Sequence, residues 1–214
     1  MSMRFFLATG NRHKLEEVVA ILSTVSPEIR VECADAVGGM PPVEEGAASF
    51  VDNARLKARA LAQRVPEGAA VIADDSGLCV DFLDGEPGVC SSRYAGAGAS
   101  DEANICLLLE RLEGVPLEKR TAHFRCVIVL LEPGGRERVF DGRCHGRIAA
   151  KPSGRGGFGY DPIFVPSDHD VSFAQLPAAR KNCISHRAAA LRKLAEWLAI
   201  FGRSVSSDRD LGSH

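Results

Sequence analysis

The sequence has little net charge, few aromatic residues and no long apolar run. Its 214 residues carry a formal net charge of −2, so no overall positive field is available to attract a nucleic acid. No apolar stretch approaches the roughly 20 residues needed to cross a bilayer. The first residues also lack the apolar region and the cleavage site of a signal peptide. We therefore expect a cytoplasmic protein that binds neither nucleic acid nor membranes.

Cysteine occurs without the spacings that metal centres and disulfide frameworks use. The seven cysteines are odd in number and dispersed, and no C-x-x-C pair is present. This pattern is typical of a reducing compartment and argues against a structural zinc site. With 45% hydrophobic and 25% charged residues, the composition is that of a globular protein. We predict one domain over residues 1–202 and a disordered tail over 203–214, where no periodic pattern is found.

The stretch 69–77 (AAVIADDSG) is an apolar run that ends in two adjacent acids. It predicts a buried strand whose end reaches the surface. The neighbouring charges of Asp74 and Asp75 make each other more costly to ionise. A Mg²⁺ ion shared with a phosphate substrate would relieve that cost, so we hypothesise a metal-dependent phosphoryl or nucleotidyl site here. Asp-Asp-Ser-Gly also favours turns, and a plain turn is the alternative.

The beginning of the chain predicts a strand, a polar turn and a helix. Residues 3–8 are apolar, Thr9, Gly10 and Asn11 interrupt them, and apolar residues then recur at helical spacing over 15–25. A helix N-terminus offers free N–H groups to an anion, and Lys14 adds a positive charge there. Alternatively, Thr9 or Asn11 only caps the helix and Lys14 is solvated. Residues 29–33 predict a second strand, parallel to the first.

The loop 34–48 holds a second pair of acids, Glu44 and Glu45. These side chains could complete a metal site with Asp75, although loop acids are usually only solvated. After the loop, Ser49 and Asp52 form a capping pattern, which predicts a helix that ends before Pro66.

The second half of the chain predicts a mixed sheet. Residues 78–82 predict a further strand, and Ser100 is expected to cap a helix with an apolar stripe over 105–112. Residues 121–131 and 137–149 alternate in polarity around a Pro-Gly-Gly turn, which predicts a hairpin. We therefore predict an α/β fold with a mixed, partly parallel twisted sheet flanked by helices.

A glycine-rich loop follows at 154–159 (GRGGFG), and it formally matches G-x-G-x-x-G. The dinucleotide-binding interpretation fails, because Tyr160, Asp161 and Pro162 stand where that fingerprint requires a helix. The loop instead presents two aromatic residues, Phe158 and Tyr160, which suits stacking on a planar base.

Three cationic or titratable residues, Lys181, His186 and Arg187, gather around Ser185 at the predicted start of an amphipathic helix. Cations are favoured at the opposite end of a helix, so we infer that they bind a ligand. A purely structural histidine is the alternative.

Together these motifs resemble a known family in order and in spacing. The sequence is similar to the non-canonical purine nucleoside triphosphate pyrophosphatases, the inosine/xanthosine triphosphatase family, over roughly residues 3–202. The residues that carry the resemblance are Thr9–Lys14, Glu44–Glu45 with Phe50–Ala54, Ala73–Gly77, Gly156–Pro162 and Ser185–Arg187.

The resemblance implies two lobes with the active site in the cleft between them, a homodimer, and Mg²⁺-dependent hydrolysis of ITP, dITP or XTP to the monophosphate and pyrophosphate. It implies that Asp75 is the general base, that Lys14 assists catalysis, and that Glu44 and Asp75 hold the metal. Ser76 would contact the substrate. The triphosphate would lie against Thr9, Gly10, Asn11, Arg12, His13 and Lys14, and the base would be surrounded by Phe158, Gly159, Tyr160, Asp161, Lys181, His186 and Arg187.

Two other functions stay open at this stage. The same acids could serve another nucleotide hydrolase, which would release orthophosphate rather than pyrophosphate. The protein could also be a nucleotide sensor, which would bind ITP with Mg²⁺ and leave it intact.

Overall fold

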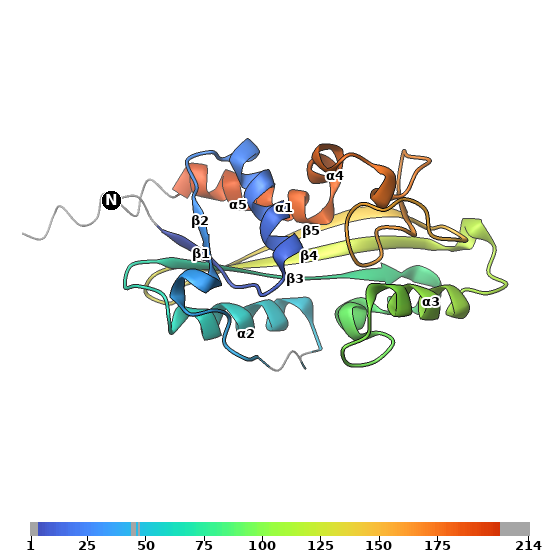
Figure 1. Ribbon diagram of the computed structural model, residues 1–214. Helices are drawn as coiled ribbons and strands as arrows, with labels where there is room; N and C mark the ends of the chain where they lie inside the picture. Colours follow the sequence, from blue (N-terminus) through green and yellow to red (C-terminus); the bar gives the residue numbers. More distant parts are fainter. Residues whose placement is uncertain (1–3, 44–45, 47, 202–214) are drawn as a thin grey trace, which may run out of the picture.

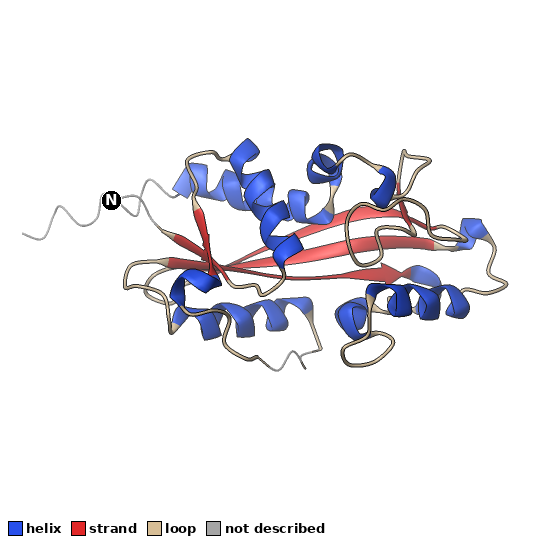
Figure 2. Cartoon of the chain, in the orientation of Figure 1, coloured by secondary structure: helices blue, strands red, loops and turns tan. Residues whose placement is uncertain are grey.

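The chain is organised around one six-stranded sheet with the strand order β2-β1-β3-β4-β5-β6 (Figure 1). The computed structural model describes residues 4–43, 46 and 48–201. The strands are β1 (Phe5–Leu7), β2 (Val31–Cys33), β3 (Ala70–Val80), β4 (Thr121–Leu131), β5 (Glu137–Ile148) and β6 (Phe164–Pro166). The helices include α1 (Arg12–Val25), α2 (Phe50–Ala62), α3 (Asp101–Arg111), α4 (Ala178–Ile184) and α5 (His186–Phe201) (Figure 2).

The sheet is parallel on one side and antiparallel on the other. β1 pairs in parallel with β2 and β3, whereas β3, β4, β5 and β6 pair in antiparallel fashion. The predicted mixed sheet and the hairpin of β4 and β5 are therefore confirmed. Gly134 and Gly135 in the hairpin turn have φ of 89° and 86°, a region that favours glycine.

The central strand is longer than predicted. β3 pairs with β4 residue by residue from Val71↔Leu131 to Val80↔Ala122, so Asp74 and Asp75 lie inside a continuous strand. The predicted strand end at the acids, and the separate strand at 78–82, are wrong. The misleading residue is Gly77, where an added Cβ would lie 2.3 Å from the Gly88 carbonyl oxygen. This glycine permits a close approach of another segment and does not end the strand.

Helices cover the two faces of the sheet in turn (Figure 1). On one face, Ile72 of β3 packs in a cluster with side chains of α1 and α5, among them Leu22 and Leu191. On the other face, Val71 and its neighbours pack against the apolar side of α2. Along the first half of β3, the alternation of side chains therefore assigns even-numbered residues to α1 and α5 and odd-numbered residues to α2. Farther along the strand, Leu78 and Val80 pack in a cluster with α3.

The C-terminal helical region has a break that the sequence analysis missed. Lys181 lies on α4, whereas His186 and Arg187 open α5, so the prediction of one helix for the whole cluster is wrong. Ser185 adopts an extended conformation between the helices, and its Oγ accepts the Ala188 N–H at 3.2 Å. The predicted cap at Ser185 is therefore confirmed.

The described residues do not test the predicted division into lobes, the domain bounds or the predicted tail. The division into two lobes and the single domain over 1–202 stay predictions, and residues 203–214 lie outside the described part of the chain. None of the helices in that part is long and apolar enough to span a membrane.

Candidate active site

The candidate site lies where the parallel and antiparallel parts of the sheet meet. β1 pairs with β3 only as far as Leu7↔Ile72, so the adjoining edge of β3 beyond Ile72 has no paired strand among the described residues. α1 leaves β1 toward one face of the sheet and α2 covers the other. Open α/β sheets bind ligands at such a point of reversal. A cavity of about 400 Å³ is found here.

Most of the residues predicted for the site line this cavity. They are Thr9, Gly10, Asn11, Lys14, Asp75, Ser76, Phe158, Gly159, Tyr160, Asp161, Lys181, His186 and Arg187. Arg12 and His13 lie in the exposed first turn of α1, next to the lining residues. Glu44 lies outside the described residues.

Asp74 and Asp75 point to opposite faces of the sheet, which the hypothesis of a shared metal did not foresee. Asp74 is buried on the α1 and α5 side, where its Oδ2 lies 3.2 Å from Lys14 Nζ and 3.0 Å from Arg187 Nη2. Burial alone would raise the pKa of Asp74, but Lys14 and Arg187 outweigh it and hold the pKa far below its usual value. Two ion pairs therefore balance the charge of this acid.

Asp75 points toward α2 and meets two residues that the sequence analysis missed. Its Oδ1 accepts a hydrogen bond from Lys57 Nζ at 2.8 Å, and its Oδ2 accepts one from Asn53 Nδ2 at 3.2 Å. Both partners are buried on the apolar face of α2. Polar residues at such positions in an amphipathic pattern are a detectable signal, because buried polar groups need partners.

The start of α1 shows both the helix cap and the inward-turned Lys14 that the sequence offered as alternatives. Asn11 caps the helix, its Oδ1 accepting the Lys14 N–H at 3.1 Å, and Thr9 Oγ1 accepts the Asn11 N–H at 3.1 Å. The Lys14 side chain nevertheless turns inward to Asp74 and is only 14% exposed. Capping and a ligand-facing charge therefore coexist in this turn.

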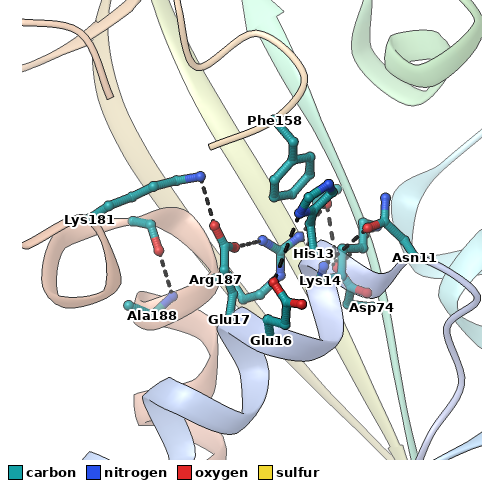
Figure 3. A network of polar contacts seen from close by, with 12 residues as sticks. Asn11, His13, Lys14, Glu16, Glu17, Asp74, Phe158, Lys181, Arg187 and Ala188 are labelled. Atoms are coloured by element: carbon teal, nitrogen blue, oxygen red, sulfur yellow. Dashed lines mark hydrogen bonds and ion pairs between the residues drawn. The ribbon is translucent and has the colours of Figure 1, made fainter. Parts of the chain in front are cut away.

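Glu17 of α1 contacts both Lys181 of α4 and Arg187 of α5 (Figure 3). The sequence analysis missed this residue as well. Its carboxylate lies 2.7 Å from Lys181 Nζ and also contacts Arg187 Nη1. Burial would raise the pKa of Glu17, but Arg187 and Lys181 lower it below its usual value. The signal was its position three residues after Lys14, on the same face of α1.

The glycine-rich loop presents Phe158 more openly than Tyr160. The Phe158 ring stacks on the His13 ring with centroids 5.4 Å apart, and Lys181 Nζ lies 4.8 Å from its centroid. The ring of Tyr160 is buried in an apolar cluster with residues of α3, and its hydroxyl donates to the Ser91 carbonyl at 2.9 Å. Phe158 is thus the aromatic residue better placed to stack on a base.

His186 is buried and neutral. It stacks on Phe124 at 4.7 Å, and burial, together with Arg187 and Lys181, lowers its pKa well below the usual value. Among the described residues, three buried side-chain atoms lack a hydrogen-bond partner: Asp74 Oδ1, His186 Nδ1 and Arg187 Nε. Asp74 and Arg187 are ion-paired with each other, and His186 precedes Arg187 in the chain. Unpaired buried polar atoms are costly and are a mark of functional sites.

Metal-binding side chains are sparse in the part of the chain that the structure describes. No group of three or more His, Cys, Asp or Glu residues there is arranged to hold an ion. Asp75 is the predicted ligand that reaches the cavity. Since Mg²⁺ is usually held by one or two carboxylates together with substrate phosphates, this donor set fits Mg²⁺ bound with a nucleotide.

The fold and the site together define an α/β protein with a cavity, lined by both basic and acidic side chains, at the switch point of an open sheet. The chain belongs to the Ham1 family, whose model matches residues 5–197. The family resemblance inferred from the sequence is therefore confirmed.

Two relatives whose names state an activity are close in sequence. A protein of Opitutus terrae named dITP/XTP pyrophosphatase is 52% identical over 200 residues, which are 91% of this chain and 98% of that protein. One of Geobacter sulfurreducens with the same name is 48% identical, over 91% and 96% of the two chains.

Solved structures agree with this assignment. The structure of a HAM1 protein from Coxiella burnetii has a TM-score of 0.81 and 39% identity, over 92% of this chain and 99% of that one. The nucleoside-triphosphatase or dITP/XTP pyrophosphatase from Mycobacterium abscessus has a TM-score of 0.71 and 41% identity, over 90% and 97%.

Proposed function

We propose that this protein is a nucleoside triphosphate pyrophosphatase that removes ITP, dITP and XTP from the nucleotide pool. It hydrolyses each of them to the monophosphate and pyrophosphate. The observation that carries the proposal is the cavity itself, which is lined together by Lys14, the start of α1, Asp75 and Phe158. The names of the relatives in Opitutus terrae and Geobacter sulfurreducens support the same activity.

The triphosphate binds at the first turn of α1. Free N–H groups and the partial positive charge of a helix N-terminus favour an anion. Thr9, Gly10, Asn11 and Lys14 line the cavity at this point, while Arg12 and His13 add charge or donors at its rim. Lys57, buried beside Asp75, contributes another cation to the lining.

Asp75 acts as the general base. A water molecule attacks the α-phosphorus, its proton passes to the Asp75 carboxylate, and the α–β bond breaks with pyrophosphate as the leaving group. Lys57 and Asn53 hold Asp75 by one hydrogen bond to each oxygen. Accepting these two bonds fixes the orientation of the carboxylate.

Mg²⁺ is the cofactor that suits this chemistry, with Asp75 and Glu44 as the proposed protein ligands. When bound, it offsets negative charge on the phosphates during hydrolysis. Lys14 supplies the same kind of compensation from the protein, and the rest of catalysis is positioning.

The purine base of the nucleotide lies against Phe158 and among Lys181, His186 and Arg187. Gly159, Tyr160 and Asp161 complete the pocket. Donors in this group bond the 6-keto oxygen of hypoxanthine or xanthine. Adenine places an amino group at that position, so a buried donor would stay unpaired, which can reject a substrate by about 10⁴-fold or more. Unmatched hydrogen bonds therefore select against ATP. Guanine keeps the 6-keto oxygen, so GTP has to be rejected at its 2-amino group.

The decisive test is a product assay with Mg²⁺. The protein is incubated separately with ITP, XTP, GTP and ATP, and pyrophosphate and orthophosphate are followed in parallel. We expect pyrophosphate from ITP and XTP and little from ATP or GTP. Orthophosphate would indicate another nucleotide hydrolase, and binding without product would indicate a sensor.

The proposed assembly is a cytoplasmic homodimer. Light scattering of the purified protein, coupled to size-exclusion chromatography, measures its mass directly. We expect twice the 22.9 kDa of one chain, and the mass of a single chain would contradict the dimer.

A further inference from the structure

The glycine-rich loop is tied across the cavity to α3 by a residue with no role assigned so far. Asp101, at the first position of α3, accepts the Gly159 N–H through Oδ2 at 2.6 Å. Its side chain lines the same cavity as the base-binding residues. The two partners are far apart in sequence, so this bond joins separate parts of the chain.

The neighbouring N–H in the loop is held from the other side. Asp161 Oδ2 accepts the Phe158 N–H at 2.9 Å and also contacts Lys181 Nζ of α4. Phe158 therefore sits between two anchored N–H groups, one fixed by Asp101 and one by Asp161. Hydrogen bonds with a charged partner are roughly twice as strong as neutral ones.

The loop needs such anchors because its backbone is not regular. Gly157 and Gly159 have φ of 74° and 59°, and glycine loses more conformational freedom on ordering than any other residue. The Tyr160 hydroxyl also donates a hydrogen bond to the Ser91 carbonyl. This second bond holds the Tyr160 side chain, whereas the Gly159 N–H is bound by Asp101.

We propose that Asp101 is a positioning residue for base recognition, which fixes the Phe158 ring in the place where the purine stacks. The proposal rests on the proposed function for its kinetic consequence. It acts through the backbone of Gly159, so Asp101 takes no part in the attack on phosphorus. Loss of the bond makes the stacking surface mobile, and the nucleotide must then order it on binding.

The kinetic test compares D101A, D101N and E102A. Glu102 is a matched control, because it lies in the same first turn of α3, is exposed, and carries the same charge. With dITP, we expect the KM of D101A to rise about tenfold, as for loss of one charge-assisted hydrogen bond, with kcat little changed. D101N keeps an acceptor oxygen and should recover most of the difference, while E102A should match the wild type.

The second measurement does not depend on turnover. Hydrogen–deuterium exchange of the peptide covering 156–161 should be faster in D101A than in the wild type and in E102A. Unchanged exchange, an equal KM in D101A and E102A, or a loss confined to kcat would each overturn the positioning role. If the wild type fails to hydrolyse dITP, the proposed function is wrong, and exchange alone decides whether Asp101 anchors the loop.

Discussion

Asp74 and Asp75 are neighbours in sequence but belong to different environments. Asp74 meets Lys14 and Arg187, whereas Asp75 meets Lys57 and Asn53. Only Asp75 lines the cavity. One acid therefore stabilises the packing of α1 and α5 on the sheet, and the other is available for chemistry.

Substitutions of the two acids should separate these roles. In D75N the amide oxygen can still accept from Lys57, so we expect the fold to persist, while pyrophosphate release falls about a hundredfold or more as for a lost general base. In D74N Lys14 loses its carboxylate partner and the buried Arg187 keeps only Glu17, so the free energy of unfolding should drop by about 3–5 kcal/mol. Urea unfolding and the product assay measure the two effects. Normal turnover in D75N would remove the assigned base.

The buried His186 predicts a pH dependence of stability. Its pKa is lowered in the folded protein from an unfolded value near 6.5, so between the two values the unfolded chain binds more protons. Stability is then fully present above about pH 6.5 and is lost as the pH falls, by up to about 1.4 kcal/mol per pH unit from this group. We expect a flatter profile of unfolding free energy between pH 7.5 and 5 in H186Q.

The control for this experiment is H169Q. His169 lies in the loop after β6 and outside the cavity lining, so we expect H169Q to keep the pH profile of the wild type. A wild-type profile in H186Q would show that another group carries the effect.

At the scale of elements, the sequence predicted most strands and helices but misjudged their continuity. Hydrophobic periodicity identified β1, α1, α2, α3, β4 and β5. It divided β3 at Asp74 because charged residues and a glycine normally mark strand ends. It joined α4 to α5 because nothing in the sequence before Ser185 marks α4 as a separate short helix. In both cases tertiary contacts determine where the element ends. For β3, ion pairs with Lys14, Lys57 and Arg187 allow the two acids to lie inside the strand.

The same reasoning explains the site. Residues in recognisable motifs reached the cavity, whereas Glu17, Asn53 and Lys57 were missed. They lie within amphipathic helices, where the sequence can indicate that a polar side chain needs a partner but cannot identify that partner on another element.

The contact of β5 with α5 depends on Gly142. An added Cβ there would lie 2.2 Å from the His186 carbonyl oxygen and 2.4 Å from the Ala190 nitrogen. Since both atoms are backbone, G142A must displace α5, and we expect the free energy of unfolding to fall by about 2 kcal/mol or more. Urea denaturation measures this loss.

A matched variant is G46A, where the added Cβ meets nothing within 4 Å. It should unfold like the wild type. Equal stability of G142A and G46A would contradict the packing described for α5.

At the scale of the whole molecule, the charges of the site are balanced by the protein itself. Lys14 pairs with Asp74, Lys57 with Asp75, and Lys181 with Glu17. The net charge of the chain is only −2, so attraction of a triphosphate is a property of the cavity and not of the surface as a whole.

This balance predicts how the protein responds to loss of metal. Because the carboxylates already have cationic partners, EDTA should leave the melting temperature nearly unchanged while it abolishes pyrophosphate release, and added Mg²⁺ should restore turnover. Calorimetry and the product assay check the two parts. Full activity in EDTA would exclude the proposed cofactor, and a large fall in melting temperature would show that the fold itself requires an ion.

The unbroken course of β3 through the site also restricts how the gene can change. Successive residues of the strand serve α1 and α2 alternately, so one codon inserted or deleted between Val71 and Asp74 would exchange the recipients of the two acids. Asp75, the proposed general base, would then lie on the side of Lys14, and Asp74, the ion-pair partner of Arg187, would be turned toward α2. We therefore expect evolution to accept point substitutions in this part of β3 but not insertions or deletions, because these would exchange the sides on which Asp74 and Asp75 lie.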